Sequence, residues 1–434
     1  MTAADVRAAL ALARPHHALV TLRRMADDAE QGGPETLAEW LELLERAGGA
    51  LAGPTFAAAV RSVQQDPDDA AALERLGRRL IGEGWPQMAV TLLGRAHRID
   101  PLDPRVLAAL VSALAADGQH ARACAVLRDA PAPRGWGLGR RGVLALHALL
   151  AGDLEAPRRC LPELLASTDP AHQELALEIG GMLARADALA RTSTLDEHDL
   201  RGWHFVVTGG LLLHRSPPGE PGMNGRYAFI HDRYADCLEG LSRAIAVLAA
   251  LHRHVDRILA PTDRASAILA RAAARHLDCP VVDWPTGDVA APGLIVAYSA
   301  DELAPDARQA LHEHRPGQVV HCHAASWTRE PPFAPDLVTR LHQYYRAPWD
   351  GHRGVDPRTG EPVQVRADDA DLATLAARIA DAPRDPPDGD LDALLALTEA
   401  ARAVEGDAAA GPLRNYGTRR RAWCGSPVPS LRFE

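Results

Sequence analysis

The sequence predicts a multidomain protein in which an all-α helical repeat array precedes an α/β domain with a mostly parallel sheet. Over about residues 50–170, sequence features return at a spacing of 34 residues, which is typical of repeats built from one helix pair. Beyond residue 200, short apolar strands alternate with amphipathic helices, and this indicates a parallel sheet covered by helices. We expect domains over 1–195 and 200–350, followed by an acidic, proline-rich extended tail with two helices over 351–434.

Glycines and Asp-Pro pairs carry the 34-residue spacing. Asp66-Pro67 recurs as Asp100-Pro101, and Gly84 recurs as Gly118 and Gly152. Small residues stand where two helices must approach closely, at Gly77, Ala89, Ala96, Ala123 and Ala130. A single helix pair cannot bury its apolar face, so it must stack on copies of itself. We predict two regular units at 70–103 and 104–137, and a degenerate third unit in which Pro157 replaces the expected alanine.

These residues and this period resemble the tetratricopeptide repeat family over about 50–170. The resemblance implies a surface that binds a protein or peptide partner. The groove-facing positions on the first helix of the regular units would be Glu74, Arg78, Arg105 and Ser112. Arginine suits bidentate capture of carboxylates, so we expect an acidic peptide. The alternative is that these side chains form only a solvated helix face.

Helices are expected on both sides of the regular units. Residues 4–47 predict two amphipathic helices broken near Gly32-Gly33-Pro34, and 54–65 predict the second helix of an incomplete leading repeat, begun by Pro54. The helical pattern continues through 143–151, 153–165 and 171–192. About ten helices are therefore expected before residue 195.

The period changes after residue 200. Trp203 to His214 is β-branched, apolar and interrupted by glycine, which predicts a strand or hairpin. Arg226 to Ile230 predicts a strand, and Asp232 is expected to cap a long helix over 233–253. We then expect strands at 257–260, 280–284, 293–298 and 317–322, and helices at 264–277, 304–313, 335–345, 369–380 and 391–404.

The element order over about 235–345 is similar to the type I phosphoribosyltransferase fold, with Ile268-Leu269-Ala270-Arg271-Ala272 leading into Pro280-Val281-Val282. That family needs an acidic pair followed directly by a Gly/Thr-rich turn, whose amides cradle a ribose phosphate. Here Asp301-Glu302 is displaced from the end of the third strand and the turn is missing. The resemblance therefore implies the fold without the transferase chemistry.

Ligands of open parallel sheets bind beyond the carboxyl ends of the strands. This rule selects Asp263, Arg264, Asp283 and Ser299 as ligand-binding candidates, and His321 and His323 as weak catalytic candidates. A nucleotide or sugar phosphate would sit on the helix that opens at Asp263, and a histidine would act as general base. The alternative at Asp263 is an ordinary helix N-cap. No metal site is expected, because His321 and His323 face one side of a strand and Cys322 the other.

Composition excludes several functions. The chain has 47 basic residues, and every one is arginine, which excludes the P-loop lysine and Schiff-base chemistry. The net charge of −10 is spread along the chain and makes nucleic acid an unlikely partner. Neither a membrane span nor a signal pattern is evident, so we expect a cytoplasmic protein with no membrane partner. The arginines at 419–421 are expected to lie in a mobile tail.

We therefore expect a non-catalytic adaptor that binds a protein or peptide through its helical array, with no cofactor. The alternative is an enzyme or small-ligand domain in the second half that acts on a nucleotide or sugar phosphate.

Overall fold

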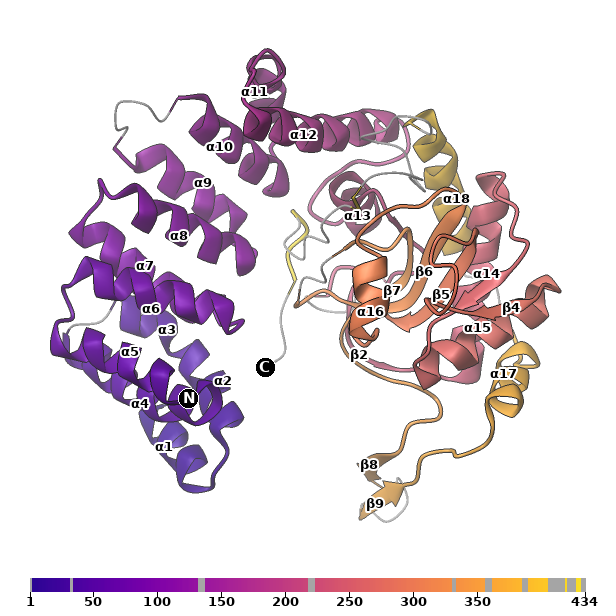
Figure 1. Cartoon of the computed structure of the whole chain (residues 1–434), viewed down its shortest axis with the longest axis horizontal. Coiled ribbons are helices and arrows are strands. Elements are labelled where there is room, and N and C mark those ends of the chain that lie inside the picture. Colours follow the sequence, from indigo (N-terminus) through magenta and orange to yellow (C-terminus); the bar gives the residue numbers. More distant parts are fainter. Residues whose placement is uncertain are drawn as a thin grey trace. The chain divides into compact units, whose positions relative to one another are not determined.

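The structure is a computed structural model of the chain. It describes residues 2–31, 34–131, 137–217, 223–329, 333–355, 361–384, 389–404, 418–419 and 427–430. The chain divides into two compact units, of which the first is Met1–Ala176 and the second is Leu177–Phe433. Figure 1 labels most of the helices and strands of both units. The predicted combination of a helical region with a mostly parallel α/β sheet is confirmed.

The first unit is helical throughout its described residues. Its helices are α1 (Ala3–Ala11), α2 (Pro15–Arg24), α3 (Ala26–Gln31), α4 (Pro34–Ala52), α5 (Pro54–Gln65), α6 (Ala70–Gly82), α7 (Pro86–Ile99), α8 (Pro104–Ala116), α9 (His120–Asp129), α10 (Leu138–Leu150), α11 (Glu155–Leu165) and α12 (Pro170–Leu189), the last of which continues into the second unit. Residues 4–47, expected as two helices, contribute to four. One added break arises because Ala13 adopts a positive φ of 53° and Pro15 begins α2.

The 34-residue period corresponds to a repeated helix ending. Gly84, Gly118 and Gly152 have positive φ values of 78°, 74° and 94°. In each case the residue after the glycine donates a backbone hydrogen bond of 2.8 Å to the carbonyl five residues earlier. This is a left-handed glycine C-cap, and it turns the chain back so that the next helix packs on the last one. The described geometry thus repeats where the sequence does.

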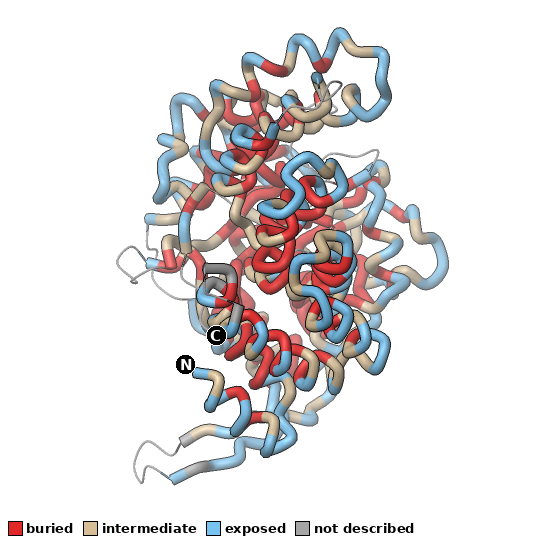
Figure 2. Tube along the Cα trace, turned by 90° about the vertical axis from the view of Figure 1, so that its left-hand side faces the viewer, coloured by how far each residue is buried: buried red, intermediate tan, exposed pale blue. Residues whose placement is uncertain are grey.

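The small residues of the repeat stand where two neighbouring helices approach each other closely. A Cβ atom on Gly77 would lie 2.5 Å from Cγ of Leu93, so α6 and α7 pack at this glycine with no room for a side chain. Ala89 and Ala96 on α7 are fully buried. In Figure 2 the buried residues lie on the facing sides of neighbouring helices and the exposed residues on their outer sides.

The second unit is built around a parallel sheet. Its strands are β1 (Leu211–Leu212), β2 (Tyr227–His231), β3 (Ile258–Ala260), β4 (Val281–Asp283), β5 (Gly293–Ser299), β6 (Gln318–Ser326) and β7 (Leu337–Arg346). The order is β1-β7-β6-β5-β3-β4, and β2 also pairs with β7; every pair is parallel. A separate antiparallel pair joins β8 (His352–Val355) to β9 (Pro362–Val365). The chain runs from β3 outward to β4 and then returns to β5 on the other side of β3, so the strand order reverses between β3 and β5.

Helices of this unit are α13 (Leu200–Thr208), α14 (Tyr234–Ala250), α15 (Arg264–Leu277), α16 (Pro305–Ala310), α17 (Leu372–Ala380) and α18 (Asp390–Ala401), with the short 3₁₀ helix η1 (Arg402–Val404). The helix α14 packs on β6 and β7, and α15 packs on β3 and β5. Two helices from beyond residue 350 form a further layer, because α17 packs on α15 and α14, and α18 packs on α14.

Three local expectations were wrong. Residues 335–345 form strand β7 in the interior of the sheet, where both faces are covered and residues 337–343 are all buried. Residues 203–208 belong to α13, which the side chain of Asp199 caps and Gly209 ends with a φ of 76°, and of the expected strand or hairpin at 203–214 there is only β1 at Leu211–Leu212. The N-cap of α14 is Arg233, whose main-chain N–H donates to Asp236 at 2.7 Å, so Asp232 is free for another role.

The chain beyond residue 350 is also less loosely attached than expected. Besides α17 and α18, Arg419 is only 4% exposed and its Nη1 atom donates to Asp336 at 2.7 Å. The rest of the expected basic run, at 420–421, lies outside the described residues. Within the described part of the chain, none of the helices is long and apolar enough to cross a bilayer.

Candidate functional site

The four predicted partner-binding residues lie on α6 and α8. Glu74 and Arg78 are one turn apart on α6 and form an ion pair. Nη2 of Arg78 donates to the main-chain oxygen of Arg105 at the start of α8, at 3.4 Å. Ser112 is exposed two turns further along α8, on the same face as Arg105. The structure thus brings Glu74, Arg78 and Arg105 together, with Ser112 further along.

Both arginines of this surface remain accessible. The side chain of Arg78 is 53% exposed and that of Arg105 is 74% exposed. Arg105 is paired locally, because its Nη2 atom lies 2.9 Å from Asp103 Oδ2. That carboxylate also caps α8 by accepting from the Arg105 main chain at 2.8 Å. The surface therefore presents two guanidinium groups that are held by neighbouring carboxylates but not buried by them.

The residues predicted at the strand ends are largely occupied by contacts within the chain. Asp263 follows β3 and caps α15, since its Oδ1 atom accepts from Ser266 N at 2.8 Å. Nη2 of Arg264 donates to the main-chain oxygens of Asp368 and Ala370, at 2.8 and 3.2 Å. The Asp263 carboxylate thus fills the helix N-terminus where an anionic ligand was expected, and Arg264 is engaged elsewhere.

Of the remaining strand-end candidates, Ser299 ends β5, the neighbour of β3, and Asp283 ends the edge strand β4. Ser299 is buried at the end of β5, and its Oγ atom accepts from Asp301 N at 3.2 Å. The Asp301 carboxylate in turn accepts from Ser326 N at 2.9 Å, which ties the ends of β5 and β6 together. Asp283 is exposed at the end of the edge strand β4. These contacts stabilise the loops and leave Asp263 and Ser299 at the point where the strand order reverses.

The two histidines point into the core rather than toward solvent. His321 is 0% exposed and His323 is 1% exposed. Nε2 of His321 lies 2.8 Å from Oγ1 of Thr339 on β7, and burial lowers the pKa of His321 to about 3. Nε2 of His323 lies 3.1 Å from Oδ2 of Asp232. Neither side chain is placed to take a proton from a substrate in solvent.

Asp232 is the centre of a buried polar cluster that the sequence did not predict. Its carboxylate accepts hydrogen bonds from the Tyr298 hydroxyl and from Nη1 of Arg340, the latter at 2.9 Å, in addition to its contact with His323. Burial alone raises the pKa of Asp232, but His323, Arg340 and Tyr298 outweigh it, and the pKa is lowered overall. Burial raises the pKa of Tyr298 well above its ordinary value.

Three side chains of this cluster are of the types that bind metal ions. The ligand atoms of Asp232, Cys237 and His323 all lie within 4.8 Å of one another and are buried, and they are donor types that zinc accepts. The Asp232 carboxylate already accepts from a tyrosine, a histidine and an arginine. Burial also raises the pKa of the Cys237 thiol well above its ordinary value, whereas zinc binds the thiolate. We interpret the cluster as a hydrogen-bonded polar core.

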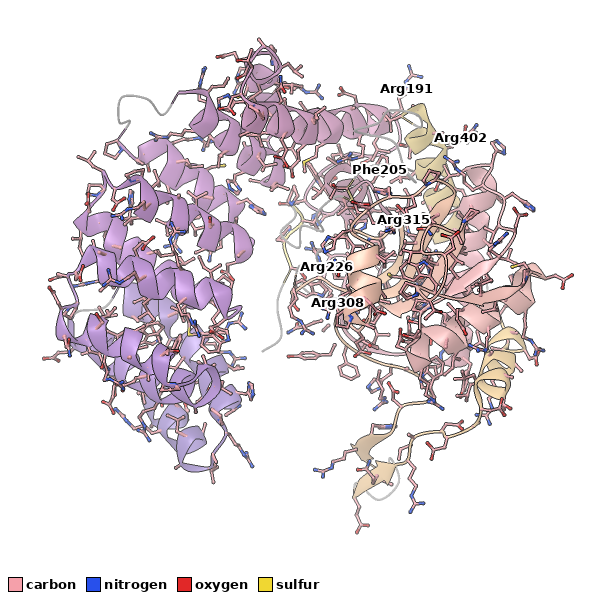
Figure 3. The ribbon with its side chains drawn as sticks, viewed as in Figure 1. Arg191, Phe205, Arg226, Arg308, Arg315 and Arg402 are labelled. Carbon is pink, nitrogen blue, oxygen red and sulfur yellow. The ribbon has the colours of Figure 1, made fainter. Side chains whose placement is uncertain are left out.

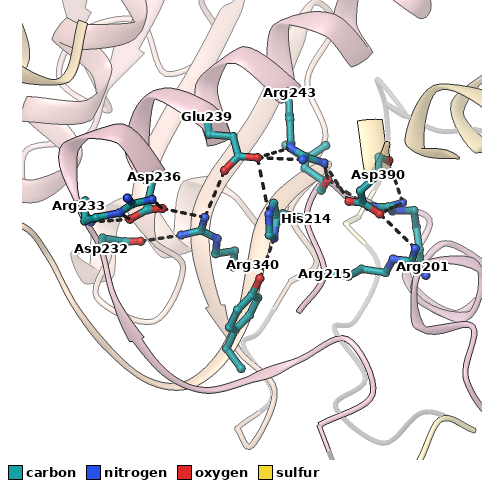
Figure 4. A network of polar contacts seen from close by, with 12 residues as sticks. Arg201, His214, Arg215, Asp232, Arg233, Asp236, Glu239, Arg243, Arg340 and Asp390 are labelled. Atoms are coloured by element: carbon teal, nitrogen blue, oxygen red, sulfur yellow. Dashed lines mark hydrogen bonds and ion pairs between the residues drawn. The ribbon is translucent and has the colours of Figure 1, made fainter. Parts of the chain in front are cut away.

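The cluster continues into a longer network of arginines and carboxylates, drawn in Figure 4. Arg340 lies 3.5 Å from Glu239, Glu239 lies 2.8 Å from Arg243, and Arg243 lies 2.9 Å from Asp390 at the start of α18. Asp390 also pairs with Arg201 and Arg215, at 2.6 and 3.1 Å. The network therefore joins α13, α14, β7 and α18.

The network also satisfies backbone groups at the sheet edge. Arg201 donates to the carbonyls of Leu212 and Leu213, at 2.8 and 3.2 Å, and Arg243 donates to Leu213 at 3.2 Å. These carbonyls belong to β1 and the residue after it, and β1 lies at the edge of the sheet. Another buried arginine, Arg226 (labelled in Figure 3), lies with its guanidinium carbon 5.4 Å from the ring centroid of Trp327. Arginine thus serves as a core residue throughout this unit.

Sequence reasoning missed these residues because the signal is weak. Arg243 and Arg340 each stand within a mainly apolar stretch, and a single charge in such a stretch is the available signal that it is buried and paired. Arg201 follows an acidic segment and lacks even this signal. Their carboxylate partners lie far away in the sequence. The chain as a whole matches no known family model and no curated protein.

Proposed function

We propose that this chain is an adaptor whose helical unit binds an acidic segment of a partner protein on the surface formed by Glu74, Arg78, Arg105 and Ser112. The observation that carries the proposal is the hydrogen bond from Arg78 Nη2 to the Arg105 main-chain oxygen, at 3.4 Å. It brings residues of two successive repeats next to each other, so a segment lying across α6 and α8 would meet both arginines. Guanidinium groups match carboxylates in shape and charge.

The local ion pairs at this surface are weak enough for a ligand carboxylate to replace them. Exposed pairs such as Arg78–Glu74 and Arg105–Asp103 contribute only about 0–1 kcal/mol each. An incoming carboxylate therefore replaces them at little cost. Before binding, the pairs with Glu74 and Asp103 hold both guanidinium groups in a defined orientation.

For the second unit we propose a structural role in the adaptor, without catalysis by His321 or His323. Support comes from their burial and from the partners that already occupy their Nε2 atoms. A general base must reach the proton that it abstracts, either directly or through one water, and neither histidine meets this condition. The cytoplasmic location and the tetratricopeptide family remain parts of this proposal.

Capture of partners from a cell lysate by the full chain tests the proposal. The Arg78→Ala/Arg105→Ala variant is compared with wild type, and Arg61→Ala serves as the matched control. Arg61 is also exposed and paired with a glutamate, but its partner is Glu45 on α4. The proposal requires at least one acidic partner that is lost with the double variant and retained with the control. Identical partner sets for all three proteins would refute it.

A further inference from the structure

A cavity of about 560 Å³ that is wide open to solvent lies in the second unit between the last turns of α15, the start of β4 and α17. This volume falls within the range of about 300–1,000 Å³ found for small-molecule sites. Ala373 and Ala376 of α17 and Val281 of β4 give it apolar walls. The cavity lies at the amino end of β4, away from the strand ends already discussed, so it is a separate feature of the fold.

Two arginines give the cavity its charge. Arg271 and Arg275 are one helical turn apart on α15, and both line the cavity. Arg271 hydrogen-bonds only within its own helix among the contacts described, from Nη1 to the Ala267 carbonyl at 3.0 Å. Within the described residues, Arg275 forms neither an ion pair nor a side-chain hydrogen bond. The cavity therefore holds a guanidinium that is available to a ligand.

Asp278 also lines the cavity and limits the charge of the ligand. With two arginines and one aspartate, the lining carries one net positive charge. The carbonyl end of α15 lies here as well and favours positive groups over negative ones. A ligand with one negative charge would therefore be neutralised, whereas a phosphate dianion would meet Asp278 and the helix end without enough compensation.

We propose that this cavity binds a small organic monoanion, namely a carboxylate attached to an apolar or aromatic body. The carboxylate pairs with Arg275 and Arg271, because the planar guanidinium matches a carboxylate bidentately. The apolar body lies against Ala373, Ala376 and Val281. This inference does not depend on the adaptor function, and it assigns the second unit a ligand of its own.

The chain contains a natural reporter for this site. Cys279 lines the cavity and is partly exposed, whereas Cys124, Cys160, Cys237 and Cys322 are buried. Cys424 lies outside the described residues and is replaced by serine in the test protein. A thiol reagent then modifies Cys279 first, and a bound ligand slows that modification.

The test measures the rate of Cys279 modification in the full Cys424→Ser chain with increasing naphthoate. Naphthamide, the neutral analogue of the same shape, is the ligand control. We expect saturable protection by naphthoate and at least about tenfold weaker apparent binding of naphthamide, because a charge-assisted pair is lost. Arg275→Ala should remove the preference for naphthoate, and Arg253→Ala, an exposed arginine outside the cavity, should not.

A second variant separates filling of the cavity from loss of charge. Ala373 is exposed on α17, so Ala373→Phe occupies the cavity without enlarging a buried residue. It should abolish protection by naphthoate and slow the modification of Cys279 by itself. Absence of saturable protection in the parent chain would overturn the proposal, and so would equal protection by naphthoate and naphthamide or no effect of Arg275→Ala.

Discussion

Nη2 of Arg201 donates a hydrogen bond of 2.6 Å to Oδ2 of Asp390, although the two residues are 189 positions apart in the chain. The side chain of Arg201 is 3% exposed and that of Asp390 is 17% exposed. Since Arg215 and Arg243 contact the same carboxylate, one aspartate binds three guanidinium groups. This contact ties α18 to α13 and to the edge of the sheet.

Asp390→Asn should therefore destabilise the second unit strongly. Removing the charge leaves the buried Arg201 without its carboxylate and Arg243 with Glu239 alone, and breaking a buried pair in this way costs about 3–5 kcal/mol. Asp392→Asn on the exposed side of α18 is the matched control, and it should change stability by less than about 0.5 kcal/mol. Urea unfolding of the full chain, with hydrogen exchange followed in α14 and α18, measures both.

The same aspartate predicts a pH effect in the acid range. Burial raises the pKa of Asp390, but its hydrogen bonds and charges with Arg201 and Arg215 outweigh burial and lower it to about 2. The unfolded chain has an aspartate pKa of about 3.9. The stabilisation is therefore present above about pH 4 and is lost as the pH falls toward 2. The stability difference between wild type and Asp390→Asn should shrink over this interval, and a difference that stayed constant would contradict the assignment.

Buried histidines should make the stability of the chain depend on pH at milder pH as well. Burial lowers the pKa of His321 to about 3 and that of His342 to about 4. As the pH falls below about 6.5 the unfolded chain takes up protons that the folded chain does not, so stability decreases. Near pH 5 these two residues should contribute a slope of about 2.5 kcal/mol per pH unit.

His321→Gln should reduce this slope by about half of that contribution, even if the variant is less stable at every pH. His198→Gln, at a largely exposed position, should leave the slope as in wild type. Urea midpoints at several pH values between 7 and 5 give the slopes. An unchanged slope in His321→Gln would show that this histidine titrates normally in the folded chain.

Two glycines at the end of α6 should affect stability in opposite directions when each is replaced by alanine. Gly84 has a positive φ of 78° with open space around it, so Gly84→Ala should cost about 1–2 kcal/mol through backbone strain alone. Gly82 lies two residues earlier in helical conformation, also with open space. Gly82→Ala should stabilise by about 0.5–1 kcal/mol. Hydrogen exchange in α6 and α7 of the full chain compares the two, and shifts of the same sign would refute the cap.

Features that depend on a few neighbouring residues could be predicted from the sequence. The spacing of Gly84 and Gly118 predicted a repeat of one helix pair, and in the structure each of these glycines ends a helix. The strands β3, β5 and β6 were also expected, because short apolar runs between helices are a local signal.

Features that depend on distant partners could not be predicted. Leu337 and Leu341 have helical spacing in the sequence. Their segment is a strand because it pairs with β6 on one side and with the edge strands on the other. Asp232 precedes a helix and was interpreted as its cap, because its real partners, Tyr298, His323 and Arg340, come from three other strands. Pairing over 66 to 108 residues leaves no local trace in a single sequence.

The most direct test of the adaptor proposal is the dissociation constant of a labelled oligoglutamate peptide, measured by fluorescence anisotropy with the full chain. We predict that Arg78→Ala/Arg105→Ala weakens binding by about tenfold or more, since each charge-assisted hydrogen bond contributes about 1.5–3 kcal/mol. Arg61→Ala should bind as wild type does, and added salt should weaken wild-type binding more than binding by the double variant. The same dissociation constant for wild type and the double variant would contradict the account.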